Sequence, residues 1–170
     1  MRKTIKFKRN LKDFRLLFRV KILLNVLQKE GFSLKVFPKE GEFFSYIDYV
    51  SENKSDLESE AEYVKNNLLK GDSWGEILVI RKKGKIVASF GPNRLERDKN
   101  GEIRARVGYF TVLPKFRKRK IGTVLWWLGL ERMKRMGASY IRCSVEKENL
   151  SALKIYLGSG MKIEKNSANE

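Results

Sequence analysis

Alternating and helical hydrophobic patterns divide the first 40 residues into three expected elements. Residues 4–8 alternate polar and apolar side chains, which favours a short edge strand. Residues 11–28 carry apolar side chains at helical spacing, and Gly31 follows as a stop signal. The expected buried face of this helix consists of Leu16, Val20, Leu23, Leu24 and Leu27. Residues 32–37 alternate again and predict a second strand.

The remaining pattern predicts one more helix and then a regular series of strands and helices. Ser55 and Glu58 have capping-box spacing, which predicts a helix that ends at Gly71. Two hairpins are expected around residues 81–85 and 98–101. The later elements are a helix at 121–136, a strand at 140–145, a helix at 150–157 and a strand at 161–164.

The region from residue 107 to residue 145 reads as a strand, a turn, a helix and a strand. Such a unit makes its two strands parallel, with a right-handed crossover. If the strands splay apart at their C-terminal ends, a ligand can enter between them. The pattern therefore predicts a mixed sheet, antiparallel at first and then with one parallel pair.

Composition limits the number of domains and the available chemistry. A chain of 170 residues with 42% hydrophobic content suits a single domain, residues 1–170. Cys143 is the only cysteine and there is no histidine, which excludes disulfides within the chain, histidine-based metal sites and Ser-His or Cys-His dyads. No apolar run reaches membrane-span or signal-peptide length, so we expect a soluble, cytoplasmic protein without a membrane partner.

The net charge of +17 is concentrated in two blocks. Residues 1–40 contain 12 basic and 3 acidic side chains, and residues 101–142 contain 11 basic and 2 acidic ones. One interpretation is solvated surface with lysine stems covering apolar area; the other is a footprint for nucleotide phosphates or nucleic acid. For residues 115–120 we favour an anionic ligand, because so many like charges in one loop repel one another.

This basic loop joins a strand to a helix. The strand stops at Pro114, the loop follows, and a helix begins near residue 121. Backbone N–H groups at a helix start lack intrahelical partners, and the helix dipole adds partial positive charge there. The arrangement is typical of a phosphate-binding turn.

Two sequence blocks resemble the GCN5-related N-acetyltransferases (GNAT family). In the first, Val112-Leu113-Pro114 and then Arg117 to Thr123 are similar to the acetyl-CoA motif, which reads Arg or Gln, two residues, Gly, one residue, then Gly or Ala. In the second, Asn149, Ala152, Tyr156 and Gly160-Met161 resemble the Asn-x-x-Ala-x-x-x-Tyr segment that ends in Gly-Phe. The resemblance covers residues 75–163 and leaves residues 1–40 as a basic N-terminal extension. It implies an α/β (α+β) GNAT fold: a mixed, mostly antiparallel sheet, one splayed parallel strand pair, and helices on both faces.

The resemblance implies an N-acetyltransferase that uses acetyl-CoA and a primary amine acceptor. The pantetheine arm is expected beside the strand residues Phe110, Thr111 and Val112, with oxyanion donors at a bulge near Phe110. The pyrophosphate is expected on the loop and first helical turn, at Arg117, Lys118, Arg119, Lys120, Ile121, Gly122 and Thr123. Asn149 is expected to bond to the pantetheine or to cap the following helix.

One departure affects the loop. Lys120 stands at the inner glycine of the motif, and Lys118 stands where glycine is also common. Glycine lets the backbone approach a phosphate closely, whereas lysine offers charge at the cost of bulk. The alternative to an enzyme is therefore a degenerate, non-catalytic relative or a basic nucleic-acid-binding protein.

The resemblance implies that Tyr156 is the general acid that protonates the departing thiolate. No general base is assigned, because Arg106 and Ser144 occupy the positions where the family carries one. The acidic residues nearby in sequence are Glu102, Glu146 and Glu148. Cys143 is expected to be a small buried strand residue, and no metal ligands are expected.

The acceptor and the assembly stay open at this level. A protein N-terminus, a lysine or a small amine all fit, and the loops expected to select among them, 38–75 and 91–101, carry no recognisable code. Acidic residues at 52–62 would suit a cationic acceptor or a solvated helix face. Since only one short strand follows Gly160, we expect either residues 4–8 or a second protomer to cover the sheet edge.

Overall fold

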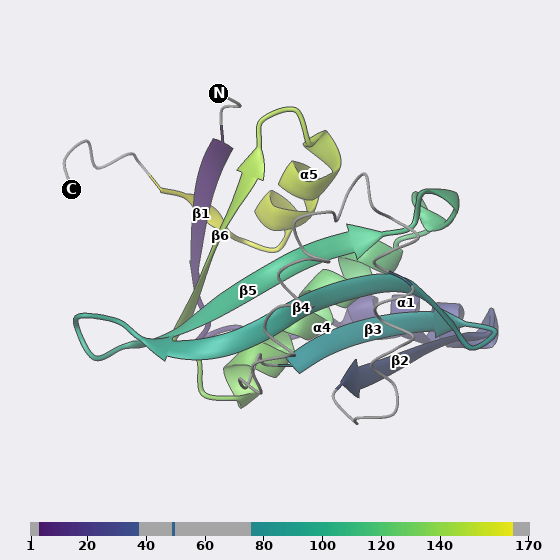
Figure 1. Cartoon of the computed structure of the whole chain (residues 1–170), viewed down its shortest axis with the longest axis horizontal. Coiled ribbons are helices and arrows are strands. Elements are labelled where there is room, and N and C mark those ends of the chain that lie inside the picture. The colour runs from purple at the N-terminus through teal and green to yellow at the C-terminus, as the bar shows by residue number, and fades with distance from the viewer. Residues whose placement is uncertain (1–3, 38–48, 50–75, 165–170) are drawn as a thin grey trace.

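Seven strands form a single sheet in a computed structural model that describes residues 4–37, 49 and 76–164 (Figure 1). Their order across the sheet is β2-β3-β4-β5-β6-β1-β7. The strands are β1 (Thr4–Asn10), β2 (Phe32–Phe37), β3 (Glu76–Lys82), β4 (Lys85–Arg97), β5 (Ile103–Val112), β6 (Tyr140–Glu146) and β7 (Lys162–Ile163). The helices are α1 (Phe18–Lys29), α4 (Ile121–Arg135), α5 (Leu150–Gly158) and the short 3-10 helix η2 (Pro114–Phe116). The predicted order of elements in the described residues is confirmed.

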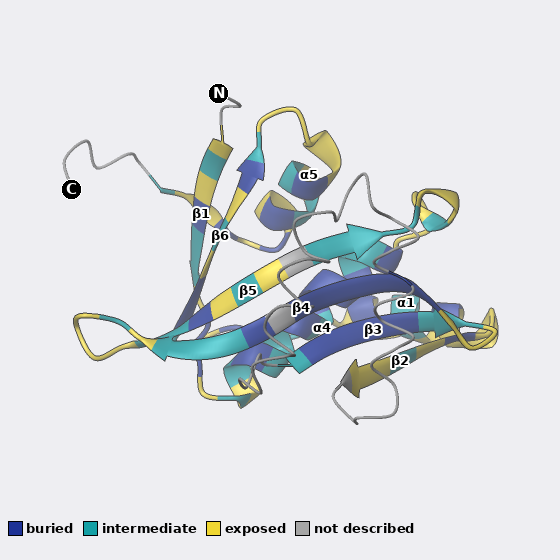
Figure 2. Cartoon of the chain, viewed as in Figure 1, coloured by how far each residue is buried: buried dark blue, intermediate teal, exposed yellow. Residues whose placement is uncertain are grey.

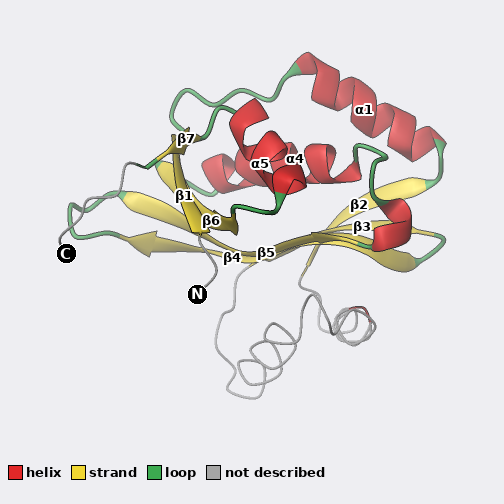
Figure 3. Ribbon diagram, turned by 90° about the horizontal axis from the view of Figure 1, so that it is seen from above, coloured by secondary structure: helices red, strands yellow, loops and turns green. Residues whose placement is uncertain are grey.

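Helices α1, α4 and α5 lie on the same face of the sheet (Figure 3). Helix α4 can approach β4 closely because residue 129 is glycine, where a Cβ atom would lie only 2.5 Å from the Phe90 ring. The predicted helix from Ser55 lies outside the described residues, so helices on the second face remain a prediction there. None of the described helices is both long and apolar enough to cross a membrane.

Strands β3, β4 and β5 form the two predicted antiparallel hairpins. The second turn is organised by Asp98, whose Oδ1 accepts from the backbone N–H groups of Asn100 at 2.8 Å and Glu102 at 2.9 Å. Strands β3 and β4 and helix α4 contain most of the buried residues (Figure 2). These elements form the buried centre of the fold, and the basic loop leads directly into α4.

Strands β5 and β6 are parallel and separate early, as the sequence predicts. They pair only at Arg104 with Tyr140, Ala105 with Ile141, and Arg106 with Arg142. Beyond Arg106 the two strands diverge (Figure 1), and β5 stays paired with β4 as far as Val112. Within the described residues, the β6-facing edge of residues 107–112 therefore has no partner strand.

The prediction that residues 4–8 form an edge strand is wrong. Strand β1 lies between β6 and β7, with seven pairs to β6 and two to β7. Phe7 is fully buried, and its ring meets the Tyr156 ring edge-on. A lone alternating pattern shows which side chains share a face, but not which strands will flank it. This position agrees with the expectation that the N-terminal segment covers the sheet edge.

Helix α1 begins at Phe18, seven residues later than the pattern indicated. The preceding segment is held in a non-helical path because Lys134 Nζ donates to the carbonyl oxygens of Lys12 at 2.7 Å and Phe14 at 2.8 Å. Leu11 and Phe14 are buried nonetheless. Apolar spacing extended the expected helix because buried loop residues and buried helix residues look alike in sequence.

Candidate functional site

The basic loop forms a compact turn between β5 and α4. Leu113 N–H donates to the Val87 carbonyl oxygen at 2.9 Å, which anchors the end of β5 beside β4. The Phe116 ring in η2 packs edge-on against the Phe32 ring, with centroids 6.0 Å apart. The turn is therefore fixed at both sides before the chain enters α4.

The start of α4 presents backbone donors and carries no acidic side chain in its first turn. The Lys120 carbonyl oxygen accepts from Val124 N–H at 3.0 Å, so the N–H groups of residues 121–123 precede the first intrahelical bond. No side chain caps this end with a hydrogen bond among the described residues. These donors and the helix dipole suit an anion.

Lys118 and Lys120 adopt the left-handed backbone conformation, with φ of 61° and 63°. Glycine takes such angles without steric cost, whereas other residues pay about 1–2 kcal/mol for them. Lys120 is the residue that stands at the motif's inner glycine. The loop therefore keeps a glycine-type backbone path at this position although the residue is lysine.

Replacing Lys120 with glycine is expected to raise the free energy of unfolding by about 0.5–1 kcal/mol. Relief of left-handed strain exceeds the entropy that glycine adds to the unfolded chain. Urea unfolding measures the change. The matched control is Lys115→Gly in η2, where positive φ is not required, and it should destabilise by a similar amount. If both variants destabilise equally, Lys120 carries no strain.

Two of the predicted phosphate-binding arginines have partners within the protein. Arg117 Nε donates to the Val112 carbonyl oxygen at 2.9 Å, which folds the loop back onto the strand end. Arg119 forms an ion pair with Glu30 and lies over the Phe32 ring, 5.1 Å from its centroid. The structure thus brings the backbone of residues 117–123 together and turns the Arg119 side chain toward α1 and β2.

Gly122 brings the loop, β5 and α5 together. A Cβ atom here would lie 3.3 Å from both Phe110 Cζ and Ile155 Cδ1. Gly91 of β4, which pairs with Tyr109 of β5, has a φ of 142°. The pairing of β4 with β5 keeps one register on both sides of this point, so the bulge expected near Phe110, with its oxyanion donors, stays a prediction.

Tyr156 lies in an aromatic cluster behind the open edge of β5. Its ring stacks on Trp126, with centroids 4.4 Å apart, and Trp126 also contacts Phe110 at 5.6 Å. The Tyr156 hydroxyl group lies near the Cys143 thiol. Burial, followed by the proximity of Cys143, raises the pKa of Tyr156 above its usual value. Its hydroxyl group therefore stays protonated at neutral pH.

Asn149 and Cys143 have clear structural roles. Asn149 Oδ1 accepts from Ala152 N–H at 3.1 Å and so caps α5, which was one of its two expected roles. Burial raises the pKa of the Cys143 thiol to about 12, and its sulfur lies 3.8 Å from Met161 Sδ. A thiol with so high a pKa is not a nucleophile at neutral pH.

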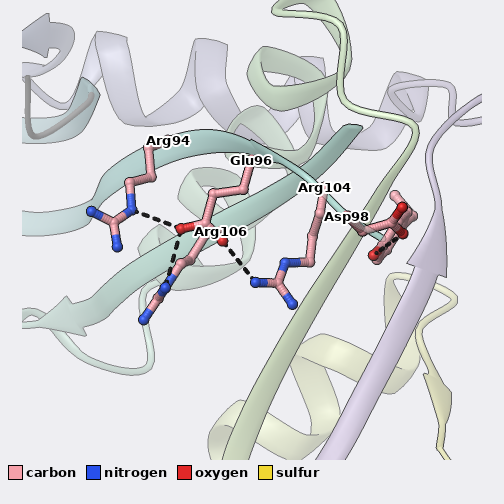
Figure 4. A network of polar contacts seen from close by, with 6 residues as sticks. Arg94, Glu96, Asp98, Arg104 and Arg106 are labelled. Atoms are coloured by element: carbon pink, nitrogen blue, oxygen red, sulfur yellow. Dashed lines mark hydrogen bonds and ion pairs between the residues drawn. The ribbon is translucent and has the colours of Figure 1, made fainter. Parts of the chain in front are cut away.

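A polar cluster on β4 and β5 was not predicted from the sequence. Arg94, Arg104 and Arg106 surround the carboxylate of Glu96 (Figure 4), at 3.1, 2.7 and 3.1 Å. We define these four residues as the arginine cluster. The available signal was the spacing of Arg94 to Glu96 and Arg104 to Arg106 on either side of the turn at Asp98, which places all four on one face of the hairpin.

Neither Glu96 of the arginine cluster nor Glu102, a candidate from the sequence, is suited to act as a general base. Glu96 lies beside Arg106, but hydrogen bonding from Arg104, followed by the charges of Arg106 and Arg94, lowers its pKa. Glu102 lies in the hairpin turn, 3.9 Å from Lys12 Nζ. A carboxylate held ionised by three guanidinium groups is a weak proton acceptor.

Solved structures share this fold at low sequence identity. A GCN5-related glucosamine N-acetyltransferase region of a fungal multi-domain β-N-acetylglucosaminidase matches with a TM-score of 0.75 and 17% identity over 95% of this chain, which spans 20% of that protein. Glucosamine-6-phosphate N-acetyltransferase from Arabidopsis thaliana matches at 0.55 and 16% identity, with 81% of this chain and 97% of that one covered. An aminoglycoside acetyltransferase from an uncultured soil sample matches at 0.65 and 14%, with 83% and 95% covered.

Sequence comparison with curated proteins finds no significant match. In contrast, the model of the acetyltransferase (GNAT) family matches residues 40–161, which is more than half of the chain. The matched range contains the splayed strand pair, the basic loop and Tyr156. The chain therefore belongs to the GNAT family of acetyltransferases, whose members use acetyl-CoA as co-substrate.

Proposed function

We propose that this protein transfers the acetyl group of acetyl-CoA to a primary amine. The observation that carries the proposal is the left-handed backbone at Lys118 and Lys120, which leads directly into the uncapped N-terminus of α4. Two left-handed lysines beside free helix donors form a strained, positively charged turn that an anionic ligand would stabilise. The aminoglycoside and glucosamine acetyltransferases that share the fold act on amines, in agreement with this proposal.

The residues present fit two parts of acetyl-CoA, the pyrophosphate and the pantetheine arm. The N–H groups of residues 118–123 hold the pyrophosphate, and the exposed Lys118 and Lys120 side chains add positive charge. The unpaired edge of β5 at Phe110, Thr111 and Val112 offers backbone groups to the pantetheine arm, as an added strand would use them. Acetyl-CoA supplies an activated acetyl group at the splay between β5 and β6.

Tyr156 holds the proton that the leaving sulfur requires. As the amine nitrogen bonds to the acetyl carbon, the carbon–sulfur bond breaks, and Tyr156 Oη gives its proton to the sulfur. The amine loses its own proton to solvent, and solvent returns a proton to Tyr156. Backbone N–H groups of β5 near Phe110 stabilise the oxyanion. No side-chain base is needed if the amine arrives neutral.

Acetyl-CoA at about 100 times its Kd is expected to raise the Tm by about 5–10 °C, because a ligand that prefers the native state stabilises it. Differential scanning fluorimetry measures this shift, and thiol release across an amine panel then measures turnover. Acetylpantetheine, which lacks the pyrophosphate, is the matched control. At the same concentration as acetyl-CoA it should shift the Tm less. Stabilisation by oligonucleotides alone, without any shift from acetyl-CoA, would instead support the nucleic-acid-binding alternative.

A further inference from the structure

The arginine cluster lies on the sheet face opposite the helices. Ala105, between Arg104 and Arg106 in β5, is fully buried in the core that includes Trp126 and Leu130 of α4. Because side chains alternate along a strand, Arg104 and Arg106 project to the other face. Their side chains remain 31% and 57% exposed. The cluster is therefore open to a ligand approaching the face that α4 does not cover.

The cluster carries more positive charge than its own carboxylate balances. Three guanidinium groups surround one carboxylate, and each contributes a single contact to it (Figure 4). A guanidinium group has five N–H donors, and the contact of each arginine with Glu96 uses one of them. The charge of Asp98 also acts on Arg104. Like charges held this close repel one another, and a second anion would relieve the repulsion.

The arginine cluster lies next to the point where β5 and β6 diverge. Arg106 and Arg142 form the last pair between β5 and β6 before the strands diverge. Arg142 is balanced by Glu164, 2.8 Å away, which leaves Arg106 as the less compensated charge at this point. Arg106 precedes Phe110 by four residues, about 13 Å along an extended strand. An anion on the cluster would therefore lie within one small molecule's length of the reacting amine.

We propose that the arginine cluster binds an anionic group, a phosphate or a carboxylate, of a small amine acceptor whose amine reaches the splay between β5 and β6. This inference rests on the proposed acetyl transfer and names its substrate class. Arginine forks match the paired oxygens of both groups. The structure thus points to an anionic acceptor, whereas the acidic residues at 52–62 suited a cationic acceptor or a solvated helix face.

The test compares matched acceptors in steady-state kinetics. Glucosamine 6-phosphate against glucosamine tests for phosphate, and 4-aminobutyrate against 1,4-diaminobutane tests for carboxylate. In at least one of these pairs, the anionic acceptor should have a KM about ten-fold or more below that of its partner. A hydrogen bond to a charged group contributes enough binding free energy for such a difference. Arg106→Ala should abolish this preference by raising the KM of the anionic acceptor without raising the KM of its neutral or cationic partner, and Arg106→Lys should restore part of it.

Two further variants separate recognition from structural and catalytic effects. Glu96→Gln removes the competing carboxylate and should lower the KM for the anionic acceptor, whereas a catalytic base at this position would instead lose kcat. Arg135→Ala, an exposed arginine on α4 paired with Glu131, is the control and should change neither value. Urea unfolding of each variant checks that the fold is intact.

The possible failures are distinguishable. Turnover of amines without any anionic preference, or with a preference that Arg106→Ala leaves intact, overturns the acceptor inference alone. Absence of acetyl-CoA binding and of turnover with every amine overturns the proposed function and the inference with it. If Arg106→Ala weakens only the salt-dependent binding of single-stranded RNA, the cluster is a nucleic-acid contact and the acceptor inference is wrong.

Discussion

Replacing Phe7 with alanine is expected to lower the free energy of unfolding by about 3–5 kcal/mol. Phe7 is fully buried in β1, a strand enclosed by β6 and β7, and its ring contacts Tyr156 with centroids 5.6 Å apart. The truncation would leave a cavity at the junction of the sheet and α5, where the surrounding strands cannot collapse freely. Chemical denaturation monitored by tryptophan fluorescence measures the loss.

Lys6→Ala is the matched control for this prediction. Lys6 lies in the same strand next to Phe7, but its side chain is exposed, so the change should stay within about 0.5 kcal/mol. A loss below about 1 kcal/mol for Phe7→Ala would mean that β1 is a dispensable addition. Because Phe7 supports Tyr156, the variant should also lower turnover if Tyr156 is the general acid.

Replacing Tyr156 with phenylalanine is expected to reduce kcat by about 10²–10⁴-fold, the usual contribution of a positioned general acid. The phenyl ring keeps the stacking on Trp126 and the edge contact with Phe7, so stability should change by no more than about 1 kcal/mol from the loss of the hydroxyl group. Thiol release at saturating acetyl-CoA measures kcat, and the ligand-induced Tm shift measures cofactor binding.

The combination of results decides the role of Tyr156. Low turnover with an unchanged acetyl-CoA shift assigns the hydroxyl group to the chemical step. Unchanged turnover makes Tyr156 a packing residue of the aromatic cluster. The raised pKa also predicts the pH profile: because the hydroxyl group ionises only above its usual range, it imposes no loss of kcat as the pH rises from 6 to 9.

The positive charges of the basic loop and those of the arginine cluster are brought together in different ways. The loop gathers charge within a few consecutive residues, so the sequence alone identified it. The cluster gathers charge from two strands that are joined by the turn at Asp98, and the pairing of Arg94 with Arg106 and Glu96 with Arg104 brings the charges together. In the proposed reaction, the basic loop would bind the phosphates of the cofactor and the arginine cluster would bind the anionic group of the acceptor.

The sequence predicted the hairpins and the parallel pair because these depend on local signals, whereas the splay of that pair was implied by the resemblance to the GNAT family. Turn residues such as Asp98 and Gly101 define hairpins over a few positions, and one crossover helix between two strands makes them parallel. The two sequence blocks that resemble the GNAT family, which contain Arg117 and Asn149, predicted the basic loop and α5. The site residues proposed for acetyl-CoA follow from the same local blocks.

Tertiary structure alone decided which strands are neighbours and which side chains are free. The position of β1 between β6 and β7 depends on contacts between residues at least 130 positions apart, for which a five-residue alternation carries no information. The ion pair of Arg119 with Glu30 is likewise a long-range pairing, whereas the three arginines around Glu96 lie within ten residues of it and come together through the pairing of β4 with β5. Hydrophobic periodicity is a local property and fixes the elements, whereas strand neighbours and charge partners depend on how those elements pack.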